Sequence, residues 1–318
     1  MYDVVALGEL LVDFLETGKD ENGVPLFAAN PGGAPCNVLS YLSCHGRKTG
    51  FIGKVGDDLL GHYLRETIEK VGIDSNGVVL DPSVPTTQAF VRTDAAGERS
   101  FSFFRNPGAD SCLSVNDLND AMIKSVRIFH FGSLSMTHSS ARWATQKAIQ
   151  TAKENGALLS FDPNYRPALW DSETLAREQI MYGCSVCDFL KLERSELAFL
   201  TGIADEAVAV AKLKEQYPIS LITVTAGAEG AAAYHGDICV RQPSFPVNQV
   251  VDTTGAGDAF CGGCLHWILD HGLTALTKEN LQEMLLHACA GASLVIGRQG
   301  ALLSMPSREQ VIVELLNL

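Results

Sequence analysis

The sequence predicts an α/β fold in which a mainly parallel sheet is covered by helices on both faces. Short apolar runs rich in β-branched residues alternate with longer amphipathic stretches along most of the chain. The 318 residues are 46% hydrophobic and 19% charged, so the chain can bury a large core. Two regions, 13–31 and 85–106, interrupt the alternation with short strands and turns. They predict a small antiparallel β lid within one domain that spans residues 1–318.

The main sheet is predicted from short, largely apolar runs, which are typical of strands buried on both faces. In chain order these runs are Val4–Leu7, Arg127–Phe131, Leu158–Phe161, Asp188–Leu192 and Leu221–Thr225. Helices are predicted over 58–71 and 139–155, where apolar residues recur at helical spacing. Strands that alternate with helices in this way enter one parallel sheet through right-handed crossovers.

The lid is predicted most clearly by the second interrupting region. Gln88–Arg92 and Arg99–Phe104 flank a glycine-containing turn at 94–97, which is the pattern of a β-hairpin. Short strands in 13–31 supply the other part of the same discontinuous lid.

Charge and composition exclude several kinds of partner. A net charge of −13 repels nucleic acid and anionic membranes, so an anionic ligand must be held by local donors. Residues 1–3 lack the basic segment and apolar core of a secretory signal, and no uncharged apolar run is long enough to cross a bilayer. We therefore expect a cytoplasmic protein that binds a small phosphorylated ligand and neither nucleic acid nor membrane.

The nine cysteines are interpreted as reduced thiols, because nothing in the sequence indicates secretion. Cys184/Cys187 and Cys261/Cys264 have CxxC spacing, which leaves a zinc or redox site open. Helical periodicity continues through both pairs and no histidine pair stands at ligand spacing. Buried small apolar side chains are the better interpretation.

The stretch 252–260, DTTGAGDAF, opens a predicted helix that continues through Leu269. Its small residues leave backbone N–H groups bare, and a helix N-terminus with bare N–H groups holds an anion such as phosphate. Asp258 lies in the first turn and faces the same anion. A carboxylate is useful there if a hydroxyl between them has to lose a proton, which indicates phosphoryl transfer to an alcohol. The alternative is that Asp258 only caps the helix.

This stretch resembles the DTxGAGD motif of the ribokinase-like, or PfkB, family of sugar kinases. Residues 31–38, PGGAPCNV, resemble the glycine pair and asparagine near the N-terminus of that family, and 53–58, GKVGDD, resemble the G-x-x-G-x-D that follows. The resemblance covers essentially the whole chain. It implies a ribokinase-like fold, a sugar as phosphate acceptor, ATP as phosphate donor and Mg²⁺ as cofactor.

By this resemblance, Gly255, Ala256 and Gly257 form an anion hole, and Asp258 is the catalytic base. The residues implied to bind the sugar are Asp13, Gly32, Gly33, Asn37, Arg105, Asn164 and Arg166. Asn164 and Arg166 belong to the stretch 162–167, DPNYRP, which resembles a fructokinase motif that reaches the transferring phosphate. Taken alone, the same residues also allow plain roles, such as a glycine turn, an exposed acid or a proline turn.

The stretch 225–230, TAGAEG, follows a predicted strand and resembles the T-x-G-x-x-G of the family. The resemblance implies that Thr225, Gly227 and Gly230 bind ATP, together with Lys191. A dinucleotide-binding fingerprint is excluded because its first glycine is missing and a strand, rather than a helix, follows at 231–234.

The implied metal sites depart in part from the family pattern. The family has N-x-x-E where this chain has Glu193 and, three residues later, Glu196. Glu196 is implied to hold Mg²⁺ through water, whereas Glu193 stands at the usual asparagine position. Asp252 and Thr254 are implied to form a K⁺ site with the loop 297–301.

These motifs together predict an ATP-dependent sugar kinase. The stretches 32–37 and 162–166 most resemble fructokinases, which convert D-fructose to fructose 6-phosphate. A 2-keto-3-deoxygluconate kinase, a ribokinase and a non-catalytic sugar-binding regulator are the alternatives. A homodimer formed through the lid is a further expectation from the resemblance.

Overall fold

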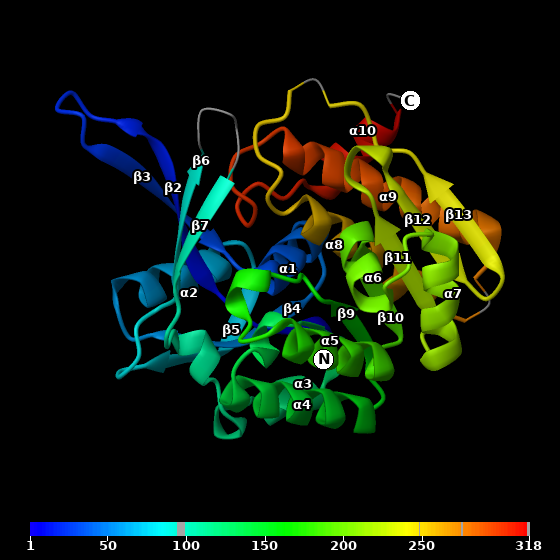
Figure 1. Cartoon of the computed structure of the whole chain (residues 1–318), viewed down its shortest axis with the longest axis horizontal. Coiled ribbons are helices and arrows are strands. Elements are labelled where there is room, and N and C mark those ends of the chain that lie inside the picture. The colour runs from blue at the N-terminus through cyan, green and yellow to red at the C-terminus, as the bar shows by residue number, and fades with distance from the viewer. Residues whose placement is uncertain (94–98, 248, 275, 317–318) are drawn as a thin grey trace.

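In the described part of the chain, a nine-stranded sheet with the order β13-β12-β11-β10-β9-β8-β1-β4-β5 runs through the centre of the molecule (Figure 1). The computed structural model describes residues 1–93, 99–247, 249–274 and 276–316. The strands from β11 to β5 in that order are parallel, and β12 and β13 continue the sheet in antiparallel fashion. The bounds are β1 Tyr2–Leu7, β4 Thr49–Gly56, β5 Ile73–Asp81, β8 Val126–Gly132, β9 Leu158–Asp162, β10 Phe189–Glu193, β11 Leu221–Thr225, β12 Ala231–His235 and β13 Ile238–Gln242.

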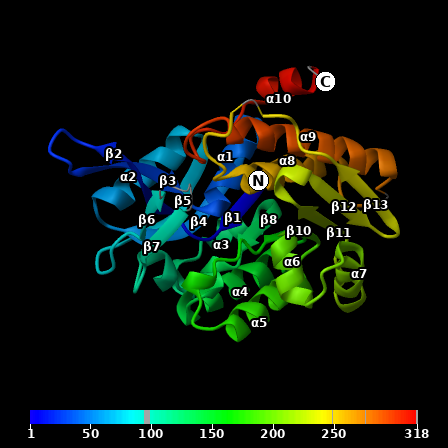
Figure 2. The ribbon, with the colours of Figure 1, turned by 45° about the horizontal axis from the view of Figure 1, so that its top comes forward.

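Helices cover both faces of this sheet, which gives three layers (Figure 2). One face carries α1 Ala34–Cys44, α2 Leu59–Lys70, α8 Ala256–His271 and α9 Lys278–Ile296, and α10 Arg308–Leu316 packs on α9. The other face carries α3 Asp120–Lys124, α4 Ser139–Glu154, α5 Glu173–Val186, α6 Arg194–Thr201 and α7 Glu206–Gln216. Short 3₁₀ turns span Ala109–Cys112, Val115–Asp117, Leu134–Met136, Pro167–Leu169 and Gly227–Glu229. Among the described residues, no helix has the length and apolarity needed to cross a membrane.

Each face of the sheet has its own hydrophobic core, because successive side chains of a strand point to opposite faces. In β1, Val4 and Ala6 belong to one core, and Val5 and Leu7 belong to the other. The four CxxC cysteines are buried, as the apolar interpretation of them expects: Cys261 and Cys264 lie in the first core, Cys184 and Cys187 in the second.

The predicted elements agree with the structure, and three further strands of the main sheet, β4, β5 and β13, were not predicted. The five apolar runs are β1, β8, β9, β10 and β11, and the two helices are α2 and α4. β4 and β5 escaped prediction because glycines weaken a strand pattern. The glycines are needed for close packing: a Cβ at Gly53 would stand 2.6 Å from the ring of Phe51, and one at Gly77 would stand 2.5 Å from the carbonyl oxygen of Phe51.

The two interrupting regions come together in a second, small sheet with the order β3-β2-β6-β7 (Figure 1). Its strands are β2 Leu11–Lys19, β3 Pro25–Gly32, β6 Gln88–Thr93 and β7 Arg99–Phe104. The β2–β3 and β6–β7 hairpins are antiparallel as predicted, whereas the central β2–β6 pair is parallel. The predicted turn at 94–97 lies outside the described residues. Because β2 starts soon after β1 ends, the small sheet stands at the carboxyl edge of the main sheet.

Candidate active site

The predicted site residues lie where parallel strands end, since the carboxyl ends of parallel strands share one edge of the sheet. Asn164 and Arg166 follow β9, Glu196 follows β10, and Gly227 follows β11. The N-termini of α1 and α8, which carry the two glycine-rich motifs, reach the same edge. The fold thus brings segments from both halves of the chain to one place.

Asp258 and Asn37 are in direct contact at this edge. The Asn37 amide donates to the Asp258 carboxylate, with 2.7 Å between Nδ2 and Oδ2, and both residues are buried. Burial and the charge of Asp162 raise the pKa of Asp258 to about 6, and the Asn37 hydrogen bond opposes this shift. Among the described residues, nothing donates to the buried Asn37 Oδ1. This oxygen is therefore a buried acceptor to which the described residues supply no donor.

The first turn of α8 has the form of an anion site. Gly255 precedes the helix with a φ of 83°, a left-handed conformation that favours glycine. A Cβ there would stand 2.5 Å from the Cβ of Ala301, so the turn also needs glycine for space. The N–H groups of the first helical turn, which includes Ala256 and Gly257, have no partner within the helix. The N–H of Ala256 donates only a long bond of 3.4 Å to the carbonyl of Thr253, which precedes the helix. Asp258 lies in the same turn.

Lys191 supplies a buried positive charge beside this turn. Its Nζ lies 3.0 Å from Asp162 Oδ2, and it would lie 3.2 Å from a Cβ at Gly257. Burial alone would lower the pKa of Lys191, but the carboxylates of Asp162, Glu196 and Asp258 raise it above its usual value. The lysine therefore stays charged and faces the anion site.

Glu196 is buried and holds two backbone amides. Its Oε2 accepts from the N–H of Glu193 and its Oε1 from the N–H of Tyr165, both at 2.7 Å. Burial raises the pKa of Glu196, and the charge of Lys191 opposes that rise. Glu193 is the N-cap residue of α6 and forms a capping box with Glu196, in which each side chain accepts a hydrogen bond from the backbone N–H of the other residue. The residue at the family's asparagine position therefore has a structural role.

Asp13, in β2 of the small sheet, and Arg166, in the turn after β9, lie close enough for their charges to interact. Burial raises the pKa of Asp13 to about 6, the charge of Arg166 lowers it, and the charge of Asp252 raises it. Arg166 lowers the pKa of Asp258 as well, so its exposed guanidinium acts on both acids. A Cβ at Gly32 would stand 2.4 Å from Asp13 Oδ2. Any larger residue at Gly32 would push this carboxylate away.

The turn after β9 has a special backbone conformation. Asn164 has a φ of 47° and is the single non-glycine residue of the described chain with positive φ. Its N–H donates to Asp162 Oδ1 at 3.3 Å, which closes an Asx turn. Asparagine tolerates the left-handed region, and this turn directs the chain from Asp162 toward Arg166.

Arg105 is buried and already has several partners. Its Nε donates to Asp110 Oδ2 at 2.8 Å, and its NH1 and NH2 groups donate to Thr137 Oγ1 and the Leu134 carbonyl. Its second NH2 donor lies 2.7 Å from Asp110 Oδ2. A guanidinium has five N–H donors and four are used, so one donor on NH1 remains for a ligand. These bonds fix Arg105 directly after the C-terminal end of β7. In the described part of the chain, no hydrogen bond or ion pair joins Arg105 to Asn37, Lys191 or Asp258.

The predicted nucleotide motif lies at the end of β11, next to the end of β10. Thr225 donates to the Leu192 carbonyl, and Gly227 and Gly230 both have positive φ. A Cβ at Gly230 would stand 2.1 Å from the Gln242 carbonyl, so only glycine fits. The motif therefore has a bare backbone without side chains at Gly227 and Gly230, which allows close approach of a ligand.

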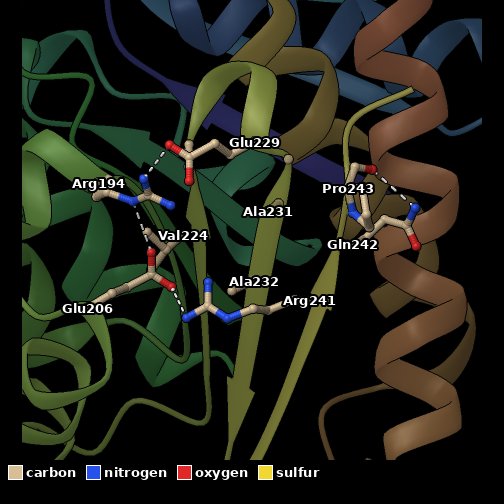
Figure 3. Close-up of a pocket in the computed structure, with 11 residues that line it drawn as sticks. Arg194, Glu206, Val224, Glu229, Ala231, Ala232, Arg241, Gln242 and Pro243 are labelled. Carbon is tan, nitrogen blue, oxygen red and sulfur yellow. Dashed lines mark hydrogen bonds and ion pairs between the residues drawn. The ribbon is translucent and has the colours of Figure 1, made fainter. Parts of the chain in front are cut away.

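A cavity of about 250 Å³ borders this motif on the side of α6 and α7 (Figure 3). Ion pairs line it: Arg194 lies between Glu229, at 2.7 Å, and Glu206, at 3.2 Å, and Arg241 lies 3.0 Å from Glu206. The described residues that line this cavity do not include Asn37, Lys191 or Asp258. These ion pairs tie the nucleotide motif to the start of α6.

The proposed K⁺ residues join two loops. Asp252 Oδ1 accepts from the N–H of Thr254 at 2.9 Å, and Asp252 Oδ2 accepts from the N–H of Gly300 at 3.4 Å. The loop 297–301 therefore does lie beside Asp252. Among the described residues, no group of three histidine, cysteine or acidic side chains is arranged to hold a metal ion.

Two buried acids of the site were not assigned by the sequence. Asp162 pairs with Lys191, and Glu9 accepts from the N–H of Ala34 beside the glycine pair. Asp162 ends a predicted strand at the ligand-binding edge, and this position was a usable signal. Glu9 stands in a loop, where an acid is ordinarily exposed, so its burial had no signal in the sequence.

Comparison with known proteins identifies the family. The model of the pfkB family carbohydrate kinases matches residues 1–308. Fructokinase-1 of Zea mays is 40% identical over 311 residues, which cover 97% of this chain and 96% of that protein. The crystal structure of fructokinase with bound ATP from Xylella fastidiosa aligns with a TM-score of 0.91 at 32% identity and covers 100% of this chain and 99% of that one. Aminoimidazole riboside kinase of Salmonella enterica aligns with a TM-score of 0.83 at 27% identity, covering 98% and 99%. The chain belongs to the pfkB family of carbohydrate kinases.

Proposed function

We propose that the protein is an ATP-dependent fructokinase that transfers the γ-phosphate of ATP to D-fructose and forms fructose 6-phosphate. The observation that carries the proposal is the buried Asp258–Asn37 pair at the anion-binding turn of α8. The names of the Zea mays relative and of the Xylella fastidiosa structure, which holds ATP, support fructose and ATP as the substrates.

The proposed mechanism assigns each group a task. Asp258 accepts the proton of the attacking sugar hydroxyl, and Asn37 keeps its carboxylate in place. The N–H groups of Gly255, Ala256 and Gly257 and the charge of Lys191 stabilise the negative charge that shifts during transfer. Thr225, Gly227 and Gly230 approach ATP through their backbone. Asp13, Gly32, Gly33, Asn164, Arg105 and Arg166 bind the sugar and the transferring phosphate.

The small sheet acts as a lid in this proposal, built from about 13–31 and 85–106 within a single kinase domain of residues 1–318. Its strand β2 carries Asp13 toward the site, and its strand β7 leads directly into Arg105. A lid that is completed by the sugar protects ATP from water.

A substrate panel tests the function. ATP consumption is measured with D-fructose, ribose, 2-keto-3-deoxygluconate and aminoimidazole riboside at equal concentration. The proposal expects the highest kcat/KM for fructose. A higher value for another sugar would reassign the substrate, and sugar binding without any turnover would make the protein a regulator.

Replacing Asp13 with alanine is expected to raise KM for fructose by about 10–100-fold, because charged hydrogen bonds to a ligand contribute about 1.5–3 kcal/mol. KM for ATP should stay within about twofold, since Asp13 lies on the sugar side. Steady-state kinetics check both constants, and Glu21→Ala, at the exposed β2–β3 turn, is the matched control. Equal rises in both KM values would remove Asp13 from the sugar site.

Mg²⁺ is proposed as the cofactor, and when bound it would neutralise charge on the phosphates of ATP. Mg²⁺ keeps several waters and takes few protein ligands, which fits a site whose acids Glu196 and Asp162 are already hydrogen-bonded. Glu196→Gln is expected to raise the Mg²⁺ concentration for half-maximal rate by about 3–10-fold. Titration of activity with Mg²⁺ measures this, and an unchanged midpoint would contradict the assignment.

K⁺ is proposed at Asp252 and Thr254, and it should raise the rate at constant ionic strength when it replaces a large organic cation. No response to K⁺ would remove this site and leave the kinase function intact.

A homodimer through the small sheet is proposed from its exposed aromatic side chains. Phe104 is 63% exposed and Phe27 is 40% exposed, and both contact the ring of Phe90. Phe104→Asp is expected to shift the protein to monomer in sedimentation equilibrium. The control is Trp143→Asp on α4, where the tryptophan is 66% exposed. A wild-type monomer would contradict the proposal.

The cytoplasmic location expected from the sequence stays a prediction.

A further inference from the structure

Glu9 is a buried carboxylate between β1 and β2 that the proposed reaction does not use. It is 4% exposed, and its Oε1 accepts a hydrogen bond from the backbone N–H of Ala34 at 2.9 Å. Ala34 is the first residue of α1, and the residue before it, Gly33, has no side chain with which to cap the helix. Glu9 therefore caps α1 from another part of the chain, where a negative charge also favours the helix dipole.

The backbone around Glu9 fixes the same helix start by close contact. Gly33 has a φ of 128°, and a Cβ there would stand 2.3 Å from the carbonyl oxygen of Glu9. A Cβ at Gly8 would stand 2.5 Å from Cγ of Pro35. The loop that contains Glu9 and the turn that contains Gly33 are thus in close contact at two places, at Gly33 and at Gly8. A shift of one would move the other.

The helix start leads directly to the catalytic pair. The N–H of Asn37 donates to the carbonyl of Gly33 at 3.0 Å, and the Asn37 side chain donates to Asp258 at 2.7 Å. Any tilt or fraying of this first turn would therefore displace the amide from Asp258. Ala34 lies within the same turn.

Charged groups around Glu9 connect it to the lid as well. Burial raises the pKa of Glu9 to about 7, the Ala34 hydrogen bond opposes this, and the charges of Asp110 and Arg105 act in opposite directions on it. Burial raises the pKa of the Cys36 thiol of α1, and the charge of Glu9 raises that pKa further. Glu9 thus bonds to α1, which carries Asn37, and its charge interacts with that of Arg105, which follows β7 of the lid.

We propose that Glu9 is a positioning residue of the sugar site, which holds the Gly33 turn and α1 so that Asn37 keeps Asp258 aligned with the sugar hydroxyl. It acts through Ala34 and Asn37 and does not touch the reacting atoms. The inference rests on the proposed sugar kinase function for its kinetic consequences, and on the hydrogen bond to Ala34 for its structural ones.

The test compares Glu9→Ala, which removes the acceptor, with Glu9→Gln, whose amide oxygen can still accept from Ala34. Glu21→Ala is the control. Glu9→Ala is expected to raise KM for fructose by about 10-fold or more and to lower kcat by about 10-fold, while KM for ATP stays within about twofold. Glu9→Gln should remain within about threefold of wild type in all three constants.

Amide hydrogen exchange of Ala34, Cys36 and Asn37 gives a readout that needs no activity. Glu9→Ala should accelerate exchange of this turn and Glu9→Gln should not. If Glu9→Ala does not fold, Glu9→Asp replaces it, because the shorter side chain withdraws the acceptor and should give the same sugar defect.

The inference is overturned if the folded Glu9→Ala variant keeps its exchange rates and KM for fructose, or if KM for ATP rises equally. Activity of the wild type on fructose together with that result would leave the proposed function standing. Accelerated exchange in Glu9→Ala with no wild-type turnover on any sugar would instead support the helix cap and refute the kinase function.

Discussion

Replacing Asp258 with asparagine is expected to lower kcat for fructose phosphorylation by about 10²–10⁴, the range that a general base contributes. Asparagine has nearly the same shape, and its carbonyl oxygen can still accept from Asn37, so the fold and ATP binding should persist. It cannot accept a proton from the sugar. Steady-state kinetics and ATP titration by calorimetry check the two halves of the prediction. A variant within threefold of wild-type kcat would remove Asp258 from the mechanism.

The pH dependence of the wild type gives a second measurement on the same residue. Burial and Asp162 raise the pKa of Asp258 to about 6, so the carboxylate is ionised above that pH and protonated below it. The ionised form is the base, and kcat/KM should therefore fall about tenfold per pH unit below about 6. The pKa of Asp13 is also about 6, so protonation of Asp13 makes the decrease of kcat/KM on the acid side, the acid limb of the pH profile, steeper. The residual rate of Asp258→Asn should lack the Asp258 part of this limb.

The main architecture could be predicted from the sequence because apolar residues recur with a clear period in both the strands and the helices. The β1 run alternates its side chains between two cores, and α2 and α4 have apolar residues at helical spacing. β4 and β5 were missed because Gly53 and Gly77 serve close packing between strands, which a single-strand pattern does not contain. The parallel β2–β6 pair was not predicted, because it joins two regions distant in sequence.

The site was predicted as a set of motifs, and their contacts were not. The DTTGAGDAF stretch indicated an anion site and a base, yet nothing in the sequence joins Asn37 to Asp258 across the fold. Arg105 was expected at the sugar, and the structure adds that most of its donors hold Asp110, Thr137 and the Leu134 carbonyl. Partners of this kind depend on the tertiary path of the chain, which local patterns do not specify.

Replacing Lys191 with methionine should affect both catalysis and stability, because its ammonium lies between Asp162 and the anion-binding turn. Loss of one charge-stabilising group at a transferring phosphate costs about 10²–10³ in kcat/KM for ATP. Removal of one partner from a buried pair leaves the other charge uncompensated and costs about 3–5 kcal/mol in the free energy of unfolding. Kinetics and urea unfolding at pH 8 measure the two effects.

The double variant Lys191→Met with Asp162→Asn separates these two effects. It removes both charges of the pair, so it should recover much of the unfolding free energy, while the kinetic loss should remain because no cation faces the phosphate. The charge of Lys191 also lowers the pKa of Asp258. In Lys191→Met the acid limb of kcat/KM should therefore move above pH 6, toward neutrality. A single variant with wild-type kcat/KM for ATP and an unshifted limb would show that Lys191 serves only to pair Asp162.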